Sequence, residues 1–192
     1  MDKNGLAQAQ ERFARLRSNA AIIASDAPMG ERESAWLDFI QCHGTIYSKL
    51  QQASKTDAKS RYWFGTKLAE RKSDKLLQYL HHARNAAEHT IIKSSSQADF
   101  SISGRVGEWG DSSQSLTIQY DHLGRPYGAA QGMKDVQVHE REVMLNAARD
   151  SGVDYPPPSE HLGEPVAEHT ARAVAALALK YAEAMLKEAD VL

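Results

Sequence analysis

Residues 73–93 read SDKLLQYLHHARNAAEHTIIK, and apolar side chains recur along them every three or four positions. This spacing places the apolar side chains on one side of a helix, so the segment is predicted to be an amphipathic helix with one buried side. Ser73 is expected to cap the start of the helix, and Asp74 to place negative charge at the positive end of the helix dipole. The predicted buried positions are Leu76, Leu77, Leu80, Ala83, Ala87 and Ile91.

The opposite side of this helix is rich in groups that form hydrogen bonds and transfer protons: His81, His82, Arg84, Asn85, Glu88 and His89. A guanidinium can bind phosphate oxygens through two hydrogen bonds and stabilise charge that develops in a transition state. Imidazole accepts or donates a proton near neutral pH. Arg84 and His89 lie about 140° apart around the helix, yet arginine is long enough for both to flank one groove. The pair therefore suits phosphodiester chemistry.

Two further amphipathic helices are predicted before this segment, over residues 5–25 and 31–53, packed as a hairpin. His43 falls on the apolar side of the second helix and is expected to be a core residue. Cys42 is the only cysteine, so neither an internal disulfide nor a cysteine-based zinc site can form. Pro165 suits the first turn of a last helix, which should pack on the first three helices to complete a four-helix bundle.

Residues 54–72 are expected to be a looser segment in which Tyr62, Trp63 and Phe64 interleave with basic side chains. Aromatic rings among Lys and Arg can stack on bases while the cations contact phosphates. The alternative is that the aromatic residues anchor a loop to the core, which is the favoured interpretation for Trp63.

The pattern changes to a period of two after residues 94–96. Residues 100–106 and 116–120 alternate in polarity and are predicted to form a hairpin, and further strands are predicted over 136–138 and 143–147. Residues 124–132 are expected to be a loop, and residues 155–158 a stiff extended connector. The expected result is a small antiparallel sheet of three or four strands between the third and last long helices.

The length of 192 residues fits a single domain, and the predicted elements make it mainly α, with its helical core at about 5–93 and 165–190 and the β insertion at about 98–150. The chain is 42% hydrophobic and 25% charged, without an apolar run long enough for a membrane span or a signal peptide, so a cytoplasmic location is expected. Residues 55–93 carry nine Lys and Arg against four Asp and Glu, although the whole chain has a net charge of −2. This basic segment favours an anionic ligand such as nucleic acid, and a solvated charged face is the alternative.

The sequence contains no Walker or dinucleotide glycine loop, no His-Glu-x-x-His and no Gly-x-Ser-x-Gly motif. The string ARNAAEH, preceded by LLQYL and by two amphipathic helices, resembles the motif of the HEPN superfamily (higher eukaryotes and prokaryotes nucleotide-binding domains). That motif is Arg, then four to six residues of which the first is usually Asn, Asp or His, then His. Arg84, Asn85 and His89 match it. The resemblance covers the helical part, and the strand region has no counterpart in the minimal family fold.

The resemblance implies a four-helix bundle of HEPN type that acts as a metal-independent endoribonuclease, without a cofactor. It further implies a homodimer in which two such helices build a composite site, and many relatives belong to toxin–antitoxin or antiviral systems, which adds an antitoxin protein as a partner. His89 would be the general base or acid acting on the RNA 2′-hydroxyl, whose attack leaves a cyclic phosphate end. Arg84 would hold the phosphate, and Asn85 would orient the phosphate or His89. Separately from the resemblance, Glu88 lies four residues after Arg84, and this helical spacing predicts that Glu88 pairs with Arg84 and holds it, with a plain surface ion pair as the alternative.

Further RNA contacts are expected from His81, His82, Lys67, Arg71 and Lys72. Two other functions remain open at this stage. The first is a non-catalytic module that binds nucleic acid or a protein partner through the basic segment. The second is a metal protein that uses His81, Asn85 and His89, or His82 and His89, but the helical partner of His81 is Asn85, a poor zinc ligand, so no metal is expected.

Overall fold

The computed structural model describes residues 1–89, 95–98, 101–106, 115–120, 126–131, 133–139 and 142–192. This described part is mainly α-helical and has five helices: α1 (Lys3–Ala24), α2 (Met29–Ala53), α3 (Ala58–Ser73), α4 (Lys75–His89) and α5 (Ala171–Asp190). The two predicted N-terminal helices are confirmed as α1 and α2. The chain divides into two compact units, one formed by Met1–Ser96 with Val143–Leu192 and the other by Gln97–Glu142. The second unit falls inside the predicted β insertion.

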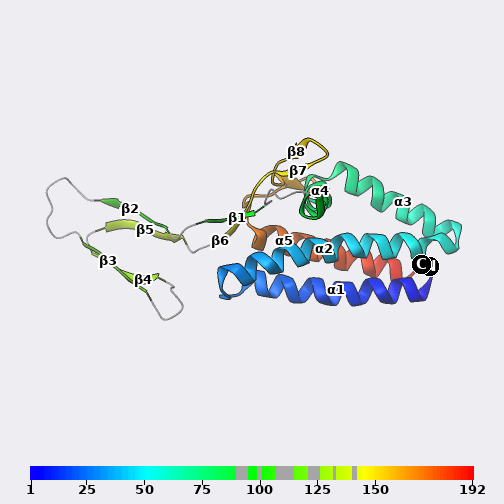
Figure 1. Cartoon of the computed structure of the whole chain (residues 1–192), viewed down its shortest axis with the longest axis horizontal. Helices are drawn as coiled ribbons and strands as arrows, with labels where there is room; N and C mark the ends of the chain where they lie inside the picture. Colours follow the sequence, from blue (N-terminus) through cyan, green and yellow to red (C-terminus); the bar gives the residue numbers. More distant parts are fainter. Residues whose placement is uncertain (90–94, 99–100, 107–114, 121–125, 132, 140–141) are drawn as a thin grey trace. The chain divides into compact units, whose positions relative to one another are not determined.

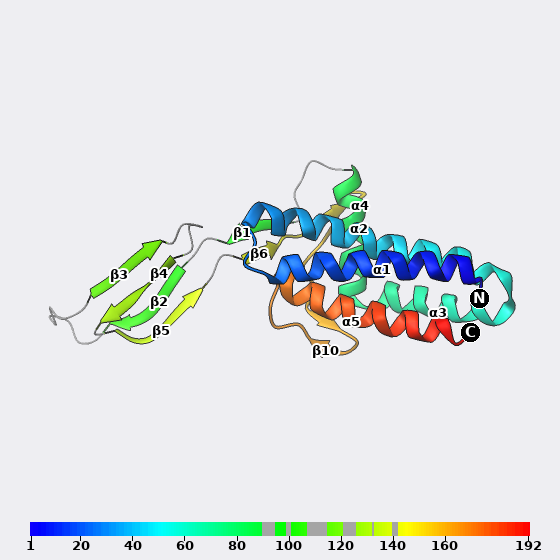
Figure 2. The same ribbon diagram turned by 90° about the horizontal axis from the view of Figure 1, so that it is seen from below.

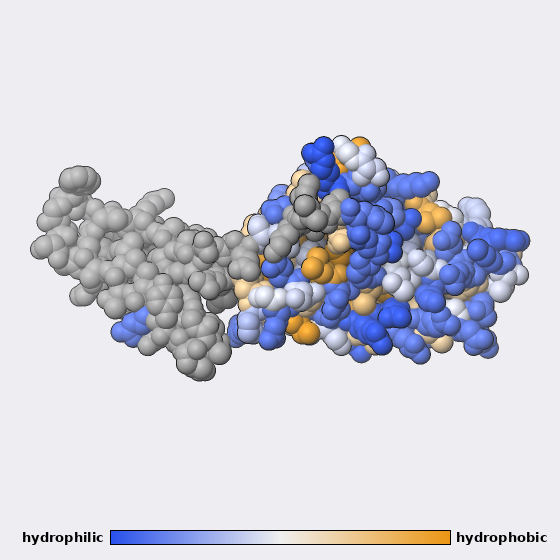
Figure 3. Space-filling model, viewed as in Figure 1, coloured by the Kyte–Doolittle hydropathy of each residue, from blue (hydrophilic) through white to orange (hydrophobic). Residues whose placement is uncertain are grey.

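In the helical unit, α1, α2 and α5 run alongside one another, and α4 lies across them (Figures 1 and 2). The two chain ends lie close together at one end of this group of helices (Figure 2). α1 and α2 pack along their length as the predicted hairpin. The face of the unit seen in Figure 3 is largely hydrophilic, with small scattered apolar patches. None of the helices in the described part of the chain has the length and apolar character needed to cross a bilayer.

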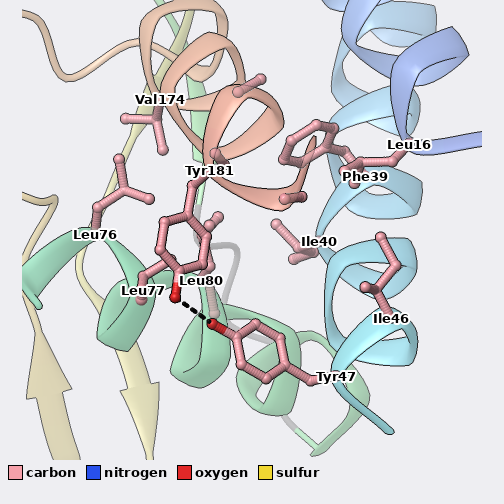
Figure 4. Packing of buried hydrophobic residues seen from close by; sticks show 14 of the residues in the cluster. Leu16, Phe39, Ile40, Ile46, Tyr47, Leu76, Leu77, Leu80, Val174 and Tyr181 are labelled. Carbon is pink, nitrogen blue, oxygen red and sulfur yellow. Dashed lines mark hydrogen bonds between the residues drawn. The ribbon is translucent and has the colours of Figure 1, made fainter. Parts of the chain in front are cut away.

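The core of the helical unit joins α1, α2, α4 and α5 (Figure 4). The tyrosine hydroxyls of Tyr47 and Tyr181 meet inside it, 3.5 Å apart. Burial of each such large apolar side chain contributes about 1.5–3 kcal/mol, so the shared core fixes α4 against its neighbours. The labelled core residues are Leu16 from α1, Phe39, Ile40, Ile46 and Tyr47 from α2, Leu76, Leu77 and Leu80 from α4, and Val174 and Tyr181 from α5.

Side-chain caps set where the helices begin. Asp74, not Ser73, caps α4: its carboxylate accepts a hydrogen bond from the amide of Leu77 at 2.9 Å. The prediction for Ser73 was wrong because this residue ends α3, where its hydroxyl donates to carbonyls of the preceding turn. The prediction for Pro165 was wrong too. Pro165 lies in a short strand, and α5 begins after Thr170, whose hydroxyl oxygen accepts from the amide of Ala173.

Residues 54–72, predicted to be loose, contain a 3₁₀ turn (Ser54–Thr56) and most of α3. Asp57 caps α3 by accepting from the amide of Ser60 at 2.8 Å. The helix was missed because its buried positions are Ser60, Phe64 and Lys67, a mixture that gives no apolar stripe. Trp63 contacts the core, and its indole nitrogen donates to Glu188 at 2.9 Å, in line with the anchoring interpretation.

Further short strands lie between α4 and α5 in the chain. β7 (Ala148–Asp150) and β8 (Val153–Tyr155) form an antiparallel hairpin, and Ser151 and Gly152 turn it with positive φ angles of 52° and 82°. β9 (Glu160–His161) pairs with β10 (Glu164–Pro165), and β1 (Ser95–Ala98) with β6 (Glu142–Leu145). β6 covers most of the strand predicted at 143–147. Tyr155, predicted to belong to the connector, instead ends β8.

The second unit contains two antiparallel pairs of strands in its described residues. β2 (Ser101–Val106) pairs with β5 (Met133–His139), and β3 (Ser115–Tyr120) pairs with β4 (Pro126–Gln131). The strand at 136–138 is confirmed, but the predicted hairpin between 100–106 and 116–120 is wrong, and so is the loop at 124–132. A sheet of three or four strands is also not formed, since each sheet described has two strands. The predicted helix end at 90–93 and the first residue of the predicted strand, Phe100, lie outside the described residues.

Candidate functional site on helix α4

The start of α4 is fixed by Asp74, whose carboxylate is buried with a side-chain exposure of 5%. His161 meets this carboxylate at 3.1 Å, and the amide of Leu162 donates to it at 2.7 Å. Burial alone would raise the pKa of Asp74, but the hydrogen bonds from His161, Leu162 and Leu77 hold that pKa below its usual value. α4 is therefore anchored by a charged group before it reaches the motif residues.

Arg84 lies on the side of α4 that faces α2. Its Nη2 donates to Glu88 at 2.8 Å, and its Nε donates to Gln41 of α2 at 3.3 Å. The Arg84–Glu88 pair is the one that the helical spacing predicts, and it is confirmed. The aliphatic part of Arg84 lies against Gly44, where an added Cβ would come within 3.1 Å of its Cδ. With a side-chain exposure of 33%, the guanidinium is held in place and still open to solvent.

His89 is the last residue of α4 and is exposed. Among the described residues, no hydrogen bond or ion pair joins it to Arg84 or to Asn85. Asn85 is instead turned toward the β7–β8 hairpin, where its Nδ2 donates to Asp150 at 3.0 Å. Within one chain, the structure thus places the three motif residues on one helix in three different settings.

A second group of polar side chains, the Asp150 cluster, forms where β7 packs against α4. It consists of His81, His82, Asn85, Asp150 and Tyr155. Nδ1 of His82 lies 2.8 Å from Oδ2 of Asp150, the oxygen that also accepts from Asn85. The ring of Tyr155 stacks on the imidazole of His82 with centroids 3.5 Å apart and planes 8° apart. His81 completes the cluster, with its ring centroid 5.0 Å from that of His82.

Two pKa shifts show which members of the Asp150 cluster carry charge. Hydrogen bonds from His82, Asn85 and Ser151 lower the pKa of Asp150 to about 2, so its carboxylate is ionised at neutral pH. Nδ1 of His82 must then be the protonated nitrogen, because an ionised carboxylate can only accept. Burial, reinforced by the positive charge of Arg71, lowers the pKa of His81 to about 4, so His81 is neutral at pH 7.

The three basic residues predicted to bind RNA from α3 are separated by the structure. Lys67 is buried, and its Nζ is paired with Glu70 at 3.2 Å and with Glu188 at 2.9 Å. The guanidinium of Arg71 lies over the ring of Tyr47 at 4.8 Å and is close enough to His81 to influence its pKa. Lys72 is exposed. Of the three, Arg71 is the one brought near the polar side of α4, whereas Lys67 belongs to an internal ion-pair network.

An open depression of about 500 Å³ lies between α1 and α2. Arg12 and Arg15 of α1 line it, together with Asp38 and Gln41 of α2. Gln41 connects the depression to the motif, since the same side chain accepts the hydrogen bond from Arg84. The two cations that line the depression, Arg12 and Arg15, were not among the predicted site residues.

Asp150 and Tyr155 were also missed by sequence reasoning. Both lie in the strand region, more than sixty residues beyond the α4 side chains they contact, and no local pattern links them to α4. The alternating Arg149 to Tyr155 segment around a Ser-Gly pair is a hairpin signal that could have been recognised. It would have predicted the turn, but not its contact with α4.

His43, predicted to be a core residue, is fully enclosed: 2% exposed, with its Nε2 buried and unpartnered in the described structure. Burial lowers the pKa of His43 to about 3, so it is neutral at pH 7.

Among the described residues, no group of three or more His, Cys, Asp or Glu side chains is arranged to hold a metal ion. Comparison of the chain with protein-family models, curated proteins and solved structures finds no match.

Proposed function

We propose that this chain is a metal-independent endoribonuclease of HEPN type that cuts RNA through attack of the 2′-hydroxyl on the adjacent phosphate. The observation that carries the proposal is the state of Arg84. Its guanidinium is partly exposed and held from two sides by Glu88 and Gln41, on the same helix as the exposed imidazole of His89. A fixed guanidinium can bind a phosphate without losing the freedom of a long side chain at that moment, which favours catalysis.

The fold proposed for this activity is a HEPN-type four-helix core made of α1, α2, α4 and α5, which share the apolar core of the helical unit. α3 then serves as an additional helix between α2 and α4. Arg12 and Arg15 support an RNA ligand, because they place positive charge in the depression between α1 and α2, which shares Gln41 with the Arg84 contact. Asp38 in the same depression offsets part of this charge.

Cleavage of labelled RNA by the purified chain, with and without EDTA, tests the proposal. We expect cleavage in both conditions, with products that end in a cyclic phosphate. Arg84→Ala and His89→Ala should each reduce the rate by about 100-fold or more. Arg17→Ala and His169→Ala are matched controls at exposed positions outside the basic segment and should cut like the wild type. Loss of cleavage in EDTA, or wild-type rates in the Arg84 and His89 variants, would rule out the proposed mechanism.

We further propose that the active form is a homodimer with composite sites, because Arg84 and His89 face different directions on one helix. Mixing the two inactive variants, Arg84→Ala and His89→Ala, tests this directly. In a mixed dimer whose sites take Arg84 from one chain and His89 from the other, one of the two sites is intact. Activity should therefore return on mixing. If each site uses both residues of one chain, every site in the mixture is defective and no activity returns.

A role in a toxin–antitoxin or antiviral system, with an antitoxin protein as partner, is the biological setting we propose. Expression of the wild-type chain should then arrest growth of the host cell, and expression of Arg84→Ala should not. Growth arrest by both proteins would argue against RNA cleavage as its cause.

The alternative function is a module that binds RNA without cutting it. It is favoured by the ion pair that Arg84 makes with Glu88 and by the hydrogen bond that engages Asn85 with Asp150. In that case RNA should remain intact, its binding should weaken steeply with salt, and the double variant Arg12→Ala with Arg15→Ala should bind more weakly than the wild type.

A further inference from the structure

We propose that His82 is a second proton-transfer residue of the α4 site, positioned by Asp150, so that RNA cleavage uses two imidazoles. This inference rests on the proposed ribonuclease function and assigns a role to a cluster that the Arg84–His89 motif does not include. Its evidence is the contact geometry around His82, the position of His82 relative to His89, and the chemistry that the cleavage step requires.

The imidazole of His82 is held more firmly than a helix surface alone would allow. Asp150 fixes it through Nδ1 at 2.8 Å, and the parallel ring of Tyr155 covers one face at 3.5 Å. Asp150 is itself held by the amide of the Asn85 side chain and by the hydroxyl of Ser151 at 3.0 Å. A carboxylate bonded to one nitrogen of a histidine fixes the tautomer and orientation of the ring, as in hydrolases in which histidine transfers protons.

The second nitrogen of His82 is the one available for chemistry. The side chain is 21% exposed, and in the described part of the chain Nε2 has no hydrogen-bond partner and is not one of the buried unpartnered nitrogens. With the proton of Nδ1 directed at Asp150, Nε2 accepts a proton when the ring is neutral and donates one when the ring is charged. This atom therefore has the access and the bonding state of a general acid or base.

His82 and His89 lie on the same stripe of α4. Seven residues correspond to nearly two full turns, so the two positions differ by about 20° around the axis and by about 10 Å along it. Asn85 lies between them on this stripe. In-line displacement at phosphorus places the attacking and the leaving oxygen on opposite sides, so two proton-transfer groups are needed at two separated points. A pair of histidines two turns apart meets this requirement, whereas a single imidazole would have to serve both oxygens.

The 2′-hydroxyl gives its proton to the neutral imidazole of His89, and its oxygen forms a bond to phosphorus. The bond from phosphorus to the 5′-oxygen breaks, and that oxygen keeps the electron pair and takes the proton from Nε2 of charged His82. The products are a 2′,3′-cyclic phosphate and a 5′-hydroxyl. His89 then loses one proton to water and His82 regains one, so no other reactant is consumed.

A sulfur substitution separates this role from a structural one. The substrate is an oligoribonucleotide with a bond that the wild type cuts, prepared with either oxygen or sulfur as the 5′-bridging atom. A thiolate leaves without being protonated, so it does not need a general acid. His82→Gln should cut the oxygen substrate about 100-fold more slowly than the wild type, and the sulfur substrate within a few-fold of it. His89→Gln should slow both substrates, and the exposed-site control His169→Gln neither.

Asp150→Asn tests the positioning role of Asp150. It also provides a second test in case His82→Gln does not fold, since asparagine keeps the shape of the aspartate side chain. It should slow the oxygen substrate by about 10-fold or more and spare the sulfur substrate. The inference fails if His82→Gln cuts the oxygen substrate at the wild-type rate, or if it slows both substrates equally, which would make His82 an RNA contact or a structural residue. If the wild type cuts no RNA from which such a substrate can be designed, the ribonuclease proposal itself fails, and this inference fails with it.

Discussion

The two sides of α4 differ in how their polar groups are held. On the α2 side, Arg84 is bound by Glu88, one turn further along the same helix, and by Gln41 of the neighbouring helix. On the hairpin side, His82 and Asn85 are bound by Asp150, which reaches α4 from a strand 65 residues beyond Asn85. The first arrangement combines an ion pair within α4 with a contact to the neighbouring helix and is partly exposed, whereas the second depends on a hairpin that follows α4 by more than sixty residues. The hairpin side is therefore held more rigidly than the motif side.

The largest loss of stability is expected from removing Asp74, which fixes the start of α4 and so supports both of its sides. Asp74→Ala removes the cap of α4 and leaves His161 and the amide of Leu162 without their buried acceptor. Unfolding in urea should show a loss of about 3 kcal/mol. The matched control is Asp2→Ala, which removes the cap of α1 at the end of the chain and should cost about 1 kcal/mol. Equal losses would show that Asp74 acts only as a helix cap.

The effect of acid on the free energy of unfolding should differ between a buried and a partly exposed histidine. The pKa of His43 is about 3 when folded, compared with 6.5 for an ordinary histidine, so below pH 6.5 the unfolded chain binds a proton that the folded chain does not. Protonation of His43 in the unfolded chain should therefore lower the free energy of unfolding by about 2 kcal/mol between pH 7 and pH 5. His43→Leu should remove that part of the pH dependence, measured by urea unfolding at both values.

His81 is the comparison residue for this experiment. Its pKa is lowered to about 4 but it is only half-buried, so His81→Gln should remove a smaller part of the acid sensitivity than His43→Leu. An unchanged pH dependence in His43→Leu would show that His43 does not remain neutral in the folded chain.

A matched pair of alanine variants compares the two sides of α4 directly. Asp150 is the common acceptor of His82 and Asn85, and its side chain is only 15% exposed. Asp150→Ala should therefore lower the free energy of unfolding by about 1.5 kcal/mol. Glu88→Ala removes a 33%-exposed ion pair and should cost at most about 0.5 kcal/mol. If Glu88→Ala proves the more costly of the two, the order of rigidity that we assign to the two sides is reversed.

The same division explains what could be predicted from the sequence. The periodicity of α1 and α2 and the i, i+4 spacing of Arg84 and Glu88 are local, and the structure confirms all three. Ala87, predicted to be buried, is exposed, and the neighbouring Ala86 is buried instead, so the buried stripe shifts by one residue near the end of α4. Asp150 and Tyr155 could not be assigned to the site, because strand register and the docking of a hairpin depend on contacts far along the chain.

The predictions for the strands of the second unit and for α3 failed for two different reasons. Alternating residues identify a strand but not its partner, so 100–106 was paired with 116–120 when β5 is its neighbour. α3 buries Lys67 through ion pairs with Glu70 and Glu188, and a hydrophobic pattern does not detect such a buried face.

The smallest effect, and the most specific test of the α2 side, is expected at Gly44. Alanine at a helix interior stabilises by about 0.5–1 kcal/mol relative to glycine, and Gly65→Ala should show this gain because no atom lies within 4 Å of its new Cβ. Gly44→Ala should gain less, because its Cβ would lie 3.1 Å from Cδ of Arg84 and push that side chain away from Gln41.

If Arg84 binds the scissile phosphate, Gly44→Ala should also slow RNA cleavage several-fold while Gly65→Ala leaves the rate unchanged, since small displacements of a positioned group reduce catalysis. Both variants keep every charge and every hydrogen-bonding side chain, so a difference between them can come only from the position of Arg84. Equal rates would mean that the place of the guanidinium beside α2 is not the one it occupies during cleavage, and that RNA or a second chain repositions it.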